Sequence, residues 1–319
     1  MLITPSNLDA LFIAFSQNFA DAYMTEPQPL VQAIGTKIPS NTRDQRYPFV
    51  QAISGAMRDW STGERQIQNV VVDGFVVTNK KWENTLAIER TDIEDDQYGV
   101  YSSMLIPNLA RHAKLLPDQQ IAAQINAGNS TLGFDGVNFF ATNHPVDPSG
   151  LTSGTQSNSL TGKPLNGTNL AIAQAQLMNL LGPDGLPMGS YGDTILVPPS
   201  LKYVADVLAN STFFPEVKNG VNAAFGSQGN PYKGQYNVVC SPWLTDSGDP
   251  TTAVWYLLDC RYANMRPFFW QEREAPQLVQ LVDPANPAVF FQDRYYMGAR
   301  ARGAASNALW FKACRVSGA

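Results

Sequence analysis

Two histidines, His112 and His144, are the only ones in the sequence, so each histidine-dependent reaction can be considered in turn. His144 lies in "FDGVNFFATNHP", a short distance after Asp135, and an aspartate–histidine pair is the beginning of a catalytic triad. The simpler interpretation is a turn in which Asp135 and Gly136 form the bend and His144 hydrogen-bonds a neighbouring carbonyl group. Because the chain contains no G-x-S-x-G, HExxH, CxxC or Walker A sequence, we expect the turn and keep a hydrolase as an alternative.

The other potentially reactive groups favour structural roles. His112 lies beside Arg111 in a helix-forming segment, where a solvent-facing histidine is typical. The acidic segment "DIEDDQ" lacks the ligand spacing and central glycine of an EF-hand loop, and acidic residues at the start of a helix are already favoured by the helix dipole. Cys240, Cys260 and Cys314 are an odd number in apolar runs, which predicts buried thiols. We therefore predict no enzyme activity, cofactor or metal site.

The charge composition and the lack of long apolar runs argue against a DNA-reading protein and against a membrane protein. Charged residues make up 15% of the chain, the net charge is −5, and no block of lysines and arginines occurs. Tight nucleic-acid binding relies on such a basic patch, so a protein that reads a DNA duplex is disfavoured. No apolar run approaches the ~20 residues that a membrane span needs, and the N-terminal segment lacks the basic region of a signal peptide. We expect a globular protein that is made in the cytosol and stays soluble, with no membrane partner.

The N-terminal segment predicts an amphipathic helix on an extended arm. Apolar residues recur at helical intervals over residues 6–24, and prolines interrupt the segment that follows. A helix of this size on a loose arm needs a surface to pack on, so we expect residues 1–65 to form an N-arm whose helix contacts a neighbouring chain. The expected contact residues are Leu8, Leu11, Phe12, Phe15 and Phe19.

Residues 66–90 change to a period of two, which predicts a long β-hairpin with its turn at "TNKKW". Half of the alternating positions are polar, so one face of the hairpin meets water or a partner. Lysines at the tip of a turn are expected to be solvated rather than nucleophilic. The residues expected at this second interface are Phe75, Val77, Lys80, Lys81 and Trp82.

The rest of the chain predicts a long helix, a compact lobe and returning strands. The strongest helical signal runs from Asp95 to Ala127, and Pro107 and Pro117 predict that it is kinked. Helices over 169–181 and 200–209 alternate with strands over 193–199, 236–241 and 253–260, around a loose Gly/Asn stretch over 218–234. The segment after Pro267, including "PAVFFQDRYYMGARARGA", reads as strands. Arg300 and Arg302 fall on one strand face and are expected to pair with carboxylates such as Asp293 or Glu272.

The N-terminal helix and the hairpin share one property: neither can cover its own apolar face at the edge of a single chain. Exposed apolar elements that recur in every copy of a protein mark interfaces. Heterologous contacts of this arm-to-neighbour kind build rings or shells. The sequence therefore predicts a self-assembling structural protein.

Four segments carry a resemblance to a known family: "ITPSNLDALF", "NKKWENTLAIERTDIEDDQYGVY", "FDGVNFFATNHP" and "YLLDCRYANMRPFFWQERE". The chain resembles, over nearly its whole length, the gpT-like major head subunits of Mu-like tailed phages, which have the Hong Kong 97 (Johnson) capsid fold. The resemblance implies an α+β fold with an N-arm (1–65), an E-loop hairpin (66–92), a peripheral domain with a spine helix (93–165), an axial domain (166–264) and returning peripheral strands (265–319). It also implies that "YLLDCRYANMRPFFWQERE" crosses between the two domains, with Arg266, Glu272 and Arg273 in ion pairs alongside Arg300 and Arg302.

The function that this resemblance implies is a major capsid protein. Copies would form the hexamers and pentamers of an icosahedral head, located in the virion, that encloses double-stranded DNA without reading its sequence. A separate scaffolding protein and a portal are the expected partners, and covalent crosslinking is not expected. An encapsulin-like compartment of the same fold is the main alternative. A tail or adhesion fibre is disfavoured by the long predicted helix.

Overall fold

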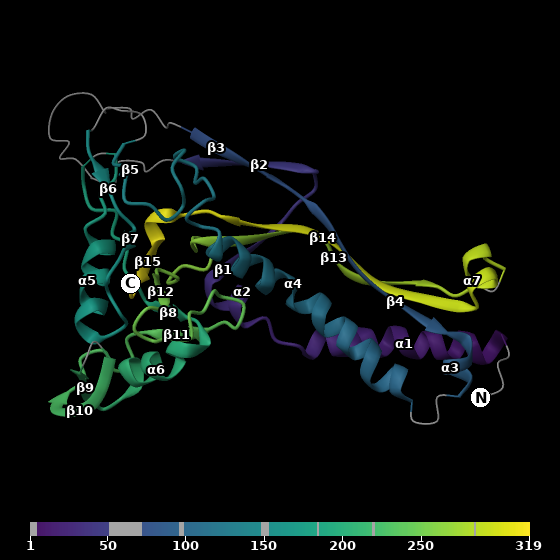
Figure 1. Cartoon of the computed structure of the whole chain (residues 1–319). Coiled ribbons are helices and arrows are strands. Elements are labelled where there is room, and N and C mark those ends of the chain that lie inside the picture. Colours follow the sequence, from purple (N-terminus) through teal and green to yellow (C-terminus); the bar gives the residue numbers. More distant parts are fainter. Residues whose placement is uncertain are drawn as a thin grey trace, which may run out of the picture.

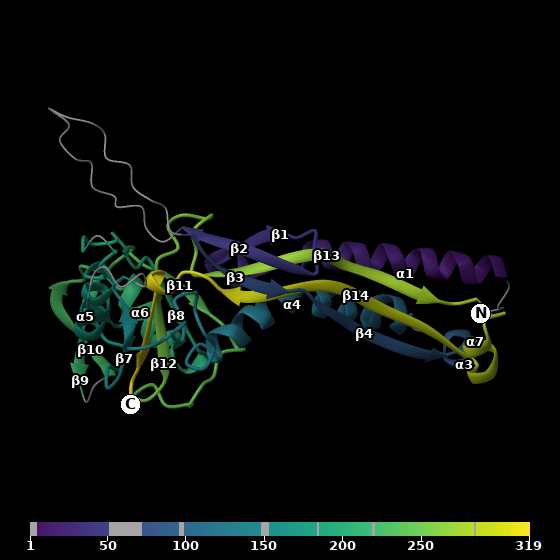
Figure 2. The ribbon, with the colours of Figure 1, turned by 90° about the horizontal axis from the view of Figure 1, so that it is seen from above.

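The computed structural model describes residues 5–50, 72–95, 99–147, 153–183, 185–218, 221–283 and 285–319. The chain is elongated, with a compact lobe at one end and a long twisted sheet lined by two helices extending from it (Figure 1). Seen from above, the sheet narrows toward a tip on the opposite side from the lobe (Figure 2). The α+β class expected from the sequence is confirmed.

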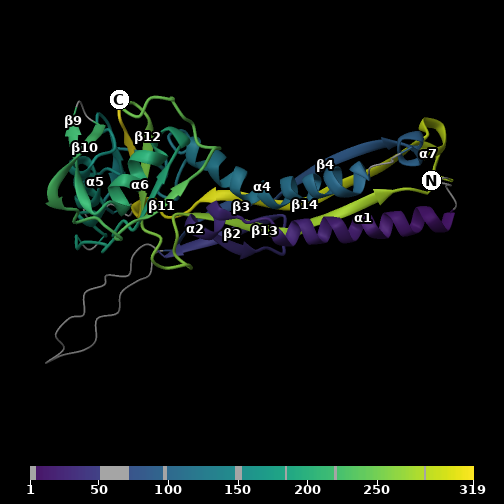
Figure 3. The same cartoon turned by 90° about the horizontal axis from the view of Figure 1, so that it is seen from below.

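The long sheet contains four strands in the order β1-β13-β14-β4. β1 runs parallel to β13, whereas β13, β14 and β4 are antiparallel neighbours. Two long helices, α1 and α4, lie side by side along one face of this sheet (Figure 3). The bounds are β1 (Gly35–Pro39), β4 (Lys80–Glu89), β13 (Phe268–Leu281), β14 (Arg294–Asn307), α1 (Pro5–Thr25) and α4 (Ile106–Asn126).

The apolar face of α1 packs inside its own chain. Phe12, Phe15 and Phe19 are each at most 5% exposed and belong to one core cluster with residues of α4 and β14. The ring of Phe12 meets that of Tyr295 edge to face at 5.5 Å. This differs from the expected contact with a neighbouring chain, because the long sheet supplies the surface that these rings need. Leu11 is half-buried against the same cluster, and the side chain of Leu8 lies outside the described residues.

The Pro-rich segment is also packed rather than loose. It forms the short helix α2 (Pro29–Ile34) and then β1, and Leu30, Val31 and Ile34 are buried. The fully buried carboxylate of Asp118, in α4, accepts the backbone N–H groups of Leu30 at 3.1 Å and Val31 at 2.9 Å. A side chain of one helix thus satisfies the first amides of another, which have no partner within their own helix.

Replacing Asp118 with alanine is expected to lower the free energy of unfolding by about 2–4 kcal/mol, because two buried N–H groups lose their acceptor. Asp118→Asn keeps one acceptor oxygen but turns its NH2 group toward the other backbone N–H, so it should cost about 1–3 kcal/mol, less than the alanine variant. Burial raises the pKa of Asp118 above its ordinary 3.8, against the two amide hydrogen bonds that lower it. Its contribution to stability is therefore largest at low pH and falls as pH rises through the folded-state pKa. The difference in unfolding free energy between wild type and Asp118→Asn should therefore shift in the Asn variant's favour as the pH rises through this range, which urea unfolding of both proteins would measure.

The prediction that the strands within residues 66–90 pair with each other as a hairpin is wrong. β3 (Val72–Thr78) is antiparallel to β2 (Asp44–Val50), whereas β4 leaves it and pairs with β14. The chain crosses from one sheet to the other at Asn79, whose side-chain amide donates to Ser40 Oγ and to the carbonyl of Thr42. "TNKKW" is thus a crossing and not a hairpin turn, so Lys80 lies on an edge strand rather than at a tip.

The β2–β3 pair covers the sheet face opposite to α1 and α4. Val77 is buried there against Phe269 and Ala304, and Phe75 is partly buried beside them. Val77 and Phe75, which we expected at an interface, therefore contact the chain's own sheet. The Tyr47 hydroxyl donates to Gln271 at 2.6 Å and ties the same pair down.

The predicted long helix is interrupted near its start. α3 (Arg90–Glu94) is followed, after residues outside the described ranges, by Gly99 at φ +63° and a π-helical turn, η1 (Tyr101–Leu105), which leads into α4. The hydroxyls of Ser102 and Ser103 both donate to the carbonyl of Gly99 and close this turn. Pro117 lies inside α4, as expected from the sequence.

The lobe is built on a five-stranded sheet in the order β11-β8-β12-β15-β7. The C-terminal strand β15 runs antiparallel to β12, so the end of the expected returning segment, residues 265–319, lies in the lobe sheet. The strands are β7 (Ser159–Leu160), β8 (Thr194–Val197), β11 (Asn237–Cys240), β12 (Val254–Leu258) and β15 (Ala313–Ser317). The lobe helices are α5 (Gly167–Met178) and α6 (Lys202–Asn210), close to the predicted ranges.

Two further elements differ from expectation. The stretch predicted to be loose, residues 218–234, contains the strand β10 (Val221–Gly229), which pairs antiparallel with β9 (Phe213–Lys218) just before it. "PAVFFQ", predicted to be a strand, is the short helix α7 (Pro287–Gln292) between β13 and β14. The remaining short elements are β5 (His144–Pro145), β6 (Thr155–Gln156), η2 (Pro199–Leu201) and η3 (Trp310–Lys312).

Candidate assembly surfaces and the buried clusters that support them

The aspartate–histidine pair singled out in the sequence exists. His144 Nδ1 lies 2.6 Å from Asp135 Oδ2, and both side chains are fully buried. Gly136, at φ +77°, forms the bend, and Asp135 Oδ1 also accepts the N–H of Val137. The bend is as predicted, but His144 contacts a carboxylate instead of a carbonyl group.

The other ring nitrogen of His144 is also occupied. Nε2 lies 3.2 Å from Oδ1 of the buried Asn158, and the imidazole stacks on Trp310 with ring centroids 3.9 Å apart. Asn158 Nδ2 donates to the carbonyls of Phe139 and Trp310, which directs Oδ1 toward His144, so Nε2 must be the donor. A triad base needs this nitrogen free to accept a proton from a nucleophile. The cluster ties four segments of the chain together and is not arranged for hydrolysis.

A second buried cluster centres on Asp259, directly after β12. Its fully buried carboxylate accepts from Lys312 Nζ at 3.0 Å and from the guanidinium of Arg261 at 3.0 Å. Lys312 is itself only 6% exposed. Burial alone would raise the pKa of Asp259, but the hydrogen bonds from Arg261 and Lys312, with the Lys312 charge, hold that pKa below its ordinary value. An ionised carboxylate is thus part of the folded lobe, and sequence reasoning missed it because Lys312 is far away in the chain.

The ion pairs predicted from the sequence are partly different from those observed. Glu272 pairs with Lys37 at 2.7 Å, and Arg300 with Glu274 at 3.5 Å rather than with Asp293 or Glu272. Arg266 donates to the backbone carbonyls of Gln32 and Gly35 instead of a carboxylate. Neither Arg273 nor Arg302 has a carboxylate within ion-pair distance in the described part of the chain.

Two of the three cysteines are buried as the sequence predicted, and the third is only half-buried. Cys260 and Cys314 are buried, and burial raises the pKa of each thiol to about 12. Cys240 is half-buried and burial also raises its pKa. Within the described ranges, no three acidic, histidine or cysteine side chains gather as metal ligands, and no helix is both long and apolar enough to cross a bilayer.

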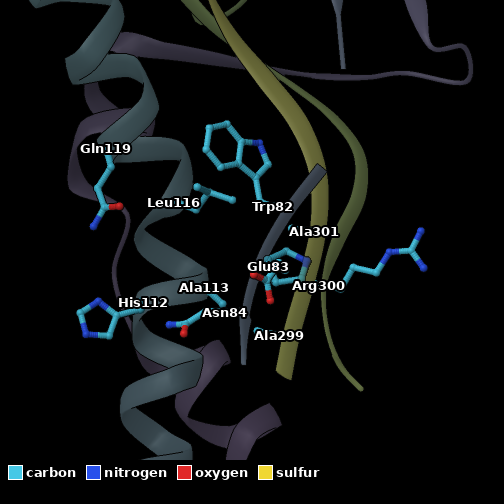
Figure 4. A pocket seen from close by; sticks show the side chains of 11 residues that line it. Trp82, Glu83, Asn84, His112, Ala113, Leu116, Gln119, Ala299, Arg300 and Ala301 are labelled. Atoms are coloured by element: carbon cyan, nitrogen blue, oxygen red, sulfur yellow. The ribbon is translucent and has the colours of Figure 1, made fainter. Parts of the chain in front are cut away.

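A groove opens between α4 and the edge strand β4 (Figure 4). It has a volume of about 330 Å³, with Trp82, Leu116 and alanines contributing apolar surface and Glu83, Arg300 and His112 contributing polar groups. Trp82 is only partly buried, and its Nε1 donates to the carbonyl of Gly303. Lys80 and Lys81 are exposed at the start of β4, whose outer edge has no strand partner among the described residues.

Comparison with known proteins decides what kind of molecule presents these surfaces. The family model for the Mu-like prophage major head subunit gpT matches residues 8–164 and 245–318. The chain belongs to this family of major capsid proteins. The first matched range includes Asp135, His144 and Asn158, and the second includes Asp259 and Lys312.

Two curated relatives agree with the family. The capsid subunit is 27% identical over 316 residues to the Mu-like prophage FluMu major head subunit of Haemophilus influenzae, covering 99% of the chain and 75% of the relative. It is 24% identical over 318 residues to the major capsid protein of Escherichia phage Mu, and this match covers 100% of the chain and 76% of the relative. Proteins of this family are structural components of the phage head.

Solved structures confirm the Hong Kong 97-type fold. A procapsid subunit of bacteriophage JBD30 matches 99% of the capsid subunit and 76% of its own length, with 26% identity and a TM-score of 0.57. An encapsulin from Synechococcus elongatus covers 92% of the chain and 87% of its own, with a TM-score of 0.52 but 9% identity, which shows a shared fold only.

Exposed apolar side chains of the capsid subunit occur at both ends of its long axis as well as along its body. On the lobe, Tyr203 of α6 is 72% exposed. At the far tip, Phe290 and Phe291 of α7 are 72% and 81% exposed. Large apolar side chains in such positions are typical of interaction surfaces rather than of a free monomer.

Proposed function

We propose that the capsid subunit assembles into the hexamers and pentamers of an icosahedral head that encloses the double-stranded DNA of a Mu-like phage or prophage, after synthesis in the cytoplasm of a bacterial host. The observation that carries this proposal is the agreement in sequence and fold with a procapsid subunit over 99% of the chain. Apolar side chains exposed at both ends of the subunit support it, because a closed shell buries such surfaces between copies.

The parts of the subunit take roles that differ in detail from the sequence expectation. We assign the long sheet with α1 and α4 to the peripheral domain, and the lobe, including β15, to the axial domain. The β2–β3 pair is the base of the E-loop. Leu11, the exposed Lys80 and Lys81 and the partly buried Trp82 remain proposed contacts with neighbours, whereas Phe12, Phe15 and Phe19 act within the subunit.

The proposed relation to DNA is confinement without sequence recognition. The net charge of −5 and the absence of a basic block in the sequence support it, because proteins that neutralise phosphates strongly need clustered lysines and arginines. A wall that binds the genome weakly lets it slide during packaging. A separate scaffolding protein and a portal complete the proposed set of partners.

The encapsulin-like compartment is the second candidate, favoured only by the shared fold. The two functions differ in what the particle contains. Shells purified from cells that also express the packaging genes of the phage should contain DNA if the subunit forms a head. Shells that contain a specific host protein and exclude DNA would support the compartment.

The first experiment is expression of the full chain, with and without a candidate scaffolding protein, followed by negative-stain electron microscopy and sedimentation velocity. We expect closed shells, or discrete hexamers and pentamers, in at least one condition. A subunit that stays monomeric in every condition would contradict the proposed function.

A further inference from the structure

The turn η3, Trp310–Lys312, connects the two parts of the molecule. It lies between the last residues of β14, in the long sheet, and the start of β15, in the sheet of the lobe. Another connection, residues 259–267, leads from β12 in the lobe to β13 in the long sheet. Figure 1 shows β13 and β14 running side by side away from the lobe. The orientation of the lobe on the long sheet therefore depends on how these connections are held.

The first residue of η3 is fastened through an aromatic ring and a carbonyl group. The ring of Trp310 is 3% exposed and stacks on His144 with centroids 3.9 Å apart. The carbonyl of Trp310 accepts Asn158 Nδ2 at 3.1 Å. Asn158 directly precedes β7 of the lobe sheet, and its own carbonyl accepts the N–H of Arg315 in β15. The start of η3 is thus tied to the edge of the lobe sheet.

The last residue of η3 is fastened through a buried charge. Lys312 Nζ donates to Asp259 Oδ2 at 3.0 Å, and the carbonyl of Lys312 accepts the N–H of Asp259 at 2.8 Å. Asp259 directly follows β12, so it begins the other connection. Because a 3-10 helix has three residues per turn, the side chains of Trp310 and Lys312 leave η3 on different sides. The turn is therefore held from two directions by two kinds of contact.

The two connections also hold each other. The backbone N–H groups of Ala308 and Leu309, just before η3, donate to the carbonyl of Pro267 at 2.9 and 3.2 Å. Pro267 is the residue that leads into β13. Both long strands of the sheet thus start from one fixed place. We define the η3 joint as η3 together with its partners His144, Asn158 and Asp259.

The chemistry of the η3 joint favours a role in geometry over a role in stability. Removing two charges from water is so unfavourable that apolar residues of similar size often stabilise a fold as well as a buried ion pair does. An ion pair, however, is satisfied only while its atoms stay within hydrogen-bond distance. If η3 moved, Lys312 and Asp259 would become buried charges without partners. The joint therefore opposes turning of the lobe more strongly than an apolar contact would.

We propose that the η3 joint fixes the orientation of the lobe on the long sheet, with Trp310 and Lys312 as positioning residues, and that this fixed orientation makes the assembled shells uniform. The inference rests on the proposed function, because it requires that copies assemble. The rotation between successive contacts decides whether an assembly closes or continues as an open structure. Contacts on the lobe and on the long sheet keep one constant rotation only if the joint does not turn. Subunits with a loosened joint should therefore give mixtures of closed and open particles.

The variant Asp259→Asn/Lys312→Met tests geometry separately from stability. It removes both charges and keeps side chains of similar size, so the urea midpoint of dissociated subunits should stay close to that of wild type. Spin labels on Thr85→Cys in β4 and Lys202→Cys in α6, both exposed positions, report the distance between the long sheet and the lobe. The distribution of this distance, measured by double electron–electron resonance, should be about twofold broader in the variant, because a released hinge turns.

The labels require that no other cysteine reacts. A Cys240→Ser background removes the half-buried thiol, and burial raises the pKa of Cys260 and Cys314 to about 12. The same double variant without labels is then assembled, and particle diameters are measured by negative-stain electron microscopy. The fraction of closed shells with the wild-type diameter should fall about twofold or more, since the joint no longer fixes one rotation.

The matched control is Glu26→Gln/Arg111→Met, which removes an ion pair of 3.1 Å between the end of α1 and α4, away from η3. It should leave the distance distribution and the shell diameters unchanged. An unchanged distance distribution in the Asp259/Lys312 double variant would overturn the inference, and so would uniform shells from subunits with a broadened distribution. Failure of the wild-type chain to form any shell would instead count against the proposed function.

Hydrogen exchange of dissociated wild-type subunits tests the joint without any substitution, and it applies even if the double variant does not fold. The N–H groups of Asp259 and Arg315 are bound to the carbonyls of Lys312 and Asn158, so they exchange only when the joint opens. We expect them to exchange as slowly as the amides of β12. Exchange as fast as in the exposed turn at residues 246–249 would contradict a rigid joint.

Discussion

Replacing Asp259 with alanine is expected to lower the free energy of unfolding of the capsid subunit by about 3–5 kcal/mol, because Lys312 would keep a charge in the interior without its carboxylate. Asp259 is fully buried and Lys312 is 6% exposed, so water cannot replace the missing partner. The loss is a large part of the ~5–15 kcal/mol that holds an ordinary domain folded. Urea unfolding of dissociated subunits would measure it.

An exposed ion pair provides the matched control. Glu89 and Arg294 also form a salt bridge, but their side chains are 51% and 47% exposed. Glu89→Ala should cost at most about 1 kcal/mol, since solvent screens such pairs. Replacing both Asp259 and Lys312 with apolar residues of similar size should cost less than Asp259→Ala alone, because no uncompensated charge remains. Equal costs for Asp259→Ala and Glu89→Ala would show that burial does not determine the strength of the pair.

The ion pair between Asp259 and Lys312 also makes the unfolding free energy depend on pH. The pKa of Asp259 is lowered from its ordinary 3.8 in the folded subunit. A lowered pKa stabilises the fold at pH values above 3.8, and this stability is lost as the pH falls through the folded-state value. Below that range, wild type and Asp259→Asn should therefore converge in unfolding free energy.

Local signals in the sequence predicted the elements that depend on near neighbours in the chain. The spacing of Phe12, Phe15 and Phe19 identified one face of α1, and Asp135 with Gly136 identified a bend. The helix of α7 also had a local signal that we overlooked: Asn286 before Pro287 is a favoured start of a helix. We predicted a strand there because the two phenylalanines of "PAVFFQ" are residues that strands favour.

The pairing of distant segments could not be predicted in this way. β3 and β4 both show a period of two, and nothing in that pattern tells β3 to pair with β2 or β4 to pair with β14. The return of β15 to the lobe and the contact of Lys312 with Asp259 have the same origin, because each depends on the finished topology. Apolar periodicity also cannot say whether a face packs within the chain or on a neighbour, which is why the face of α1 was assigned to an interface.

Replacing His144 with alanine is the second change with a large expected effect, a loss of about 3–5 kcal/mol in unfolding free energy. The buried Asp135 would lose its closest partner, Asn158 Oδ1 would lose a donor, and Trp310 would lose the ring stacked on it. His112 is the matched control, because it is exposed on α4 and His112→Ala should change stability by no more than about 0.5 kcal/mol. Urea unfolding of dissociated subunits checks both variants.

A double-mutant cycle separates the two sources of this effect. Asp135→Asn replaces the carboxylate that faces His144 Nδ1 and keeps a side chain of similar shape, so His144→Ala should cost about 1–2 kcal/mol less in that background. If His144→Ala costs the same in both backgrounds, the stacking on Trp310 and the cavity left behind account for the effect, and the contact with Asp135 contributes nothing. The hydrolase alternative predicts a different result. Wild type would hydrolyse an ester, and a His144→Ala variant that folds as stably as wild type would lose this activity. The contact of His144 Nε2 with Asn158 argues against that result, because it leaves no room for a nucleophile.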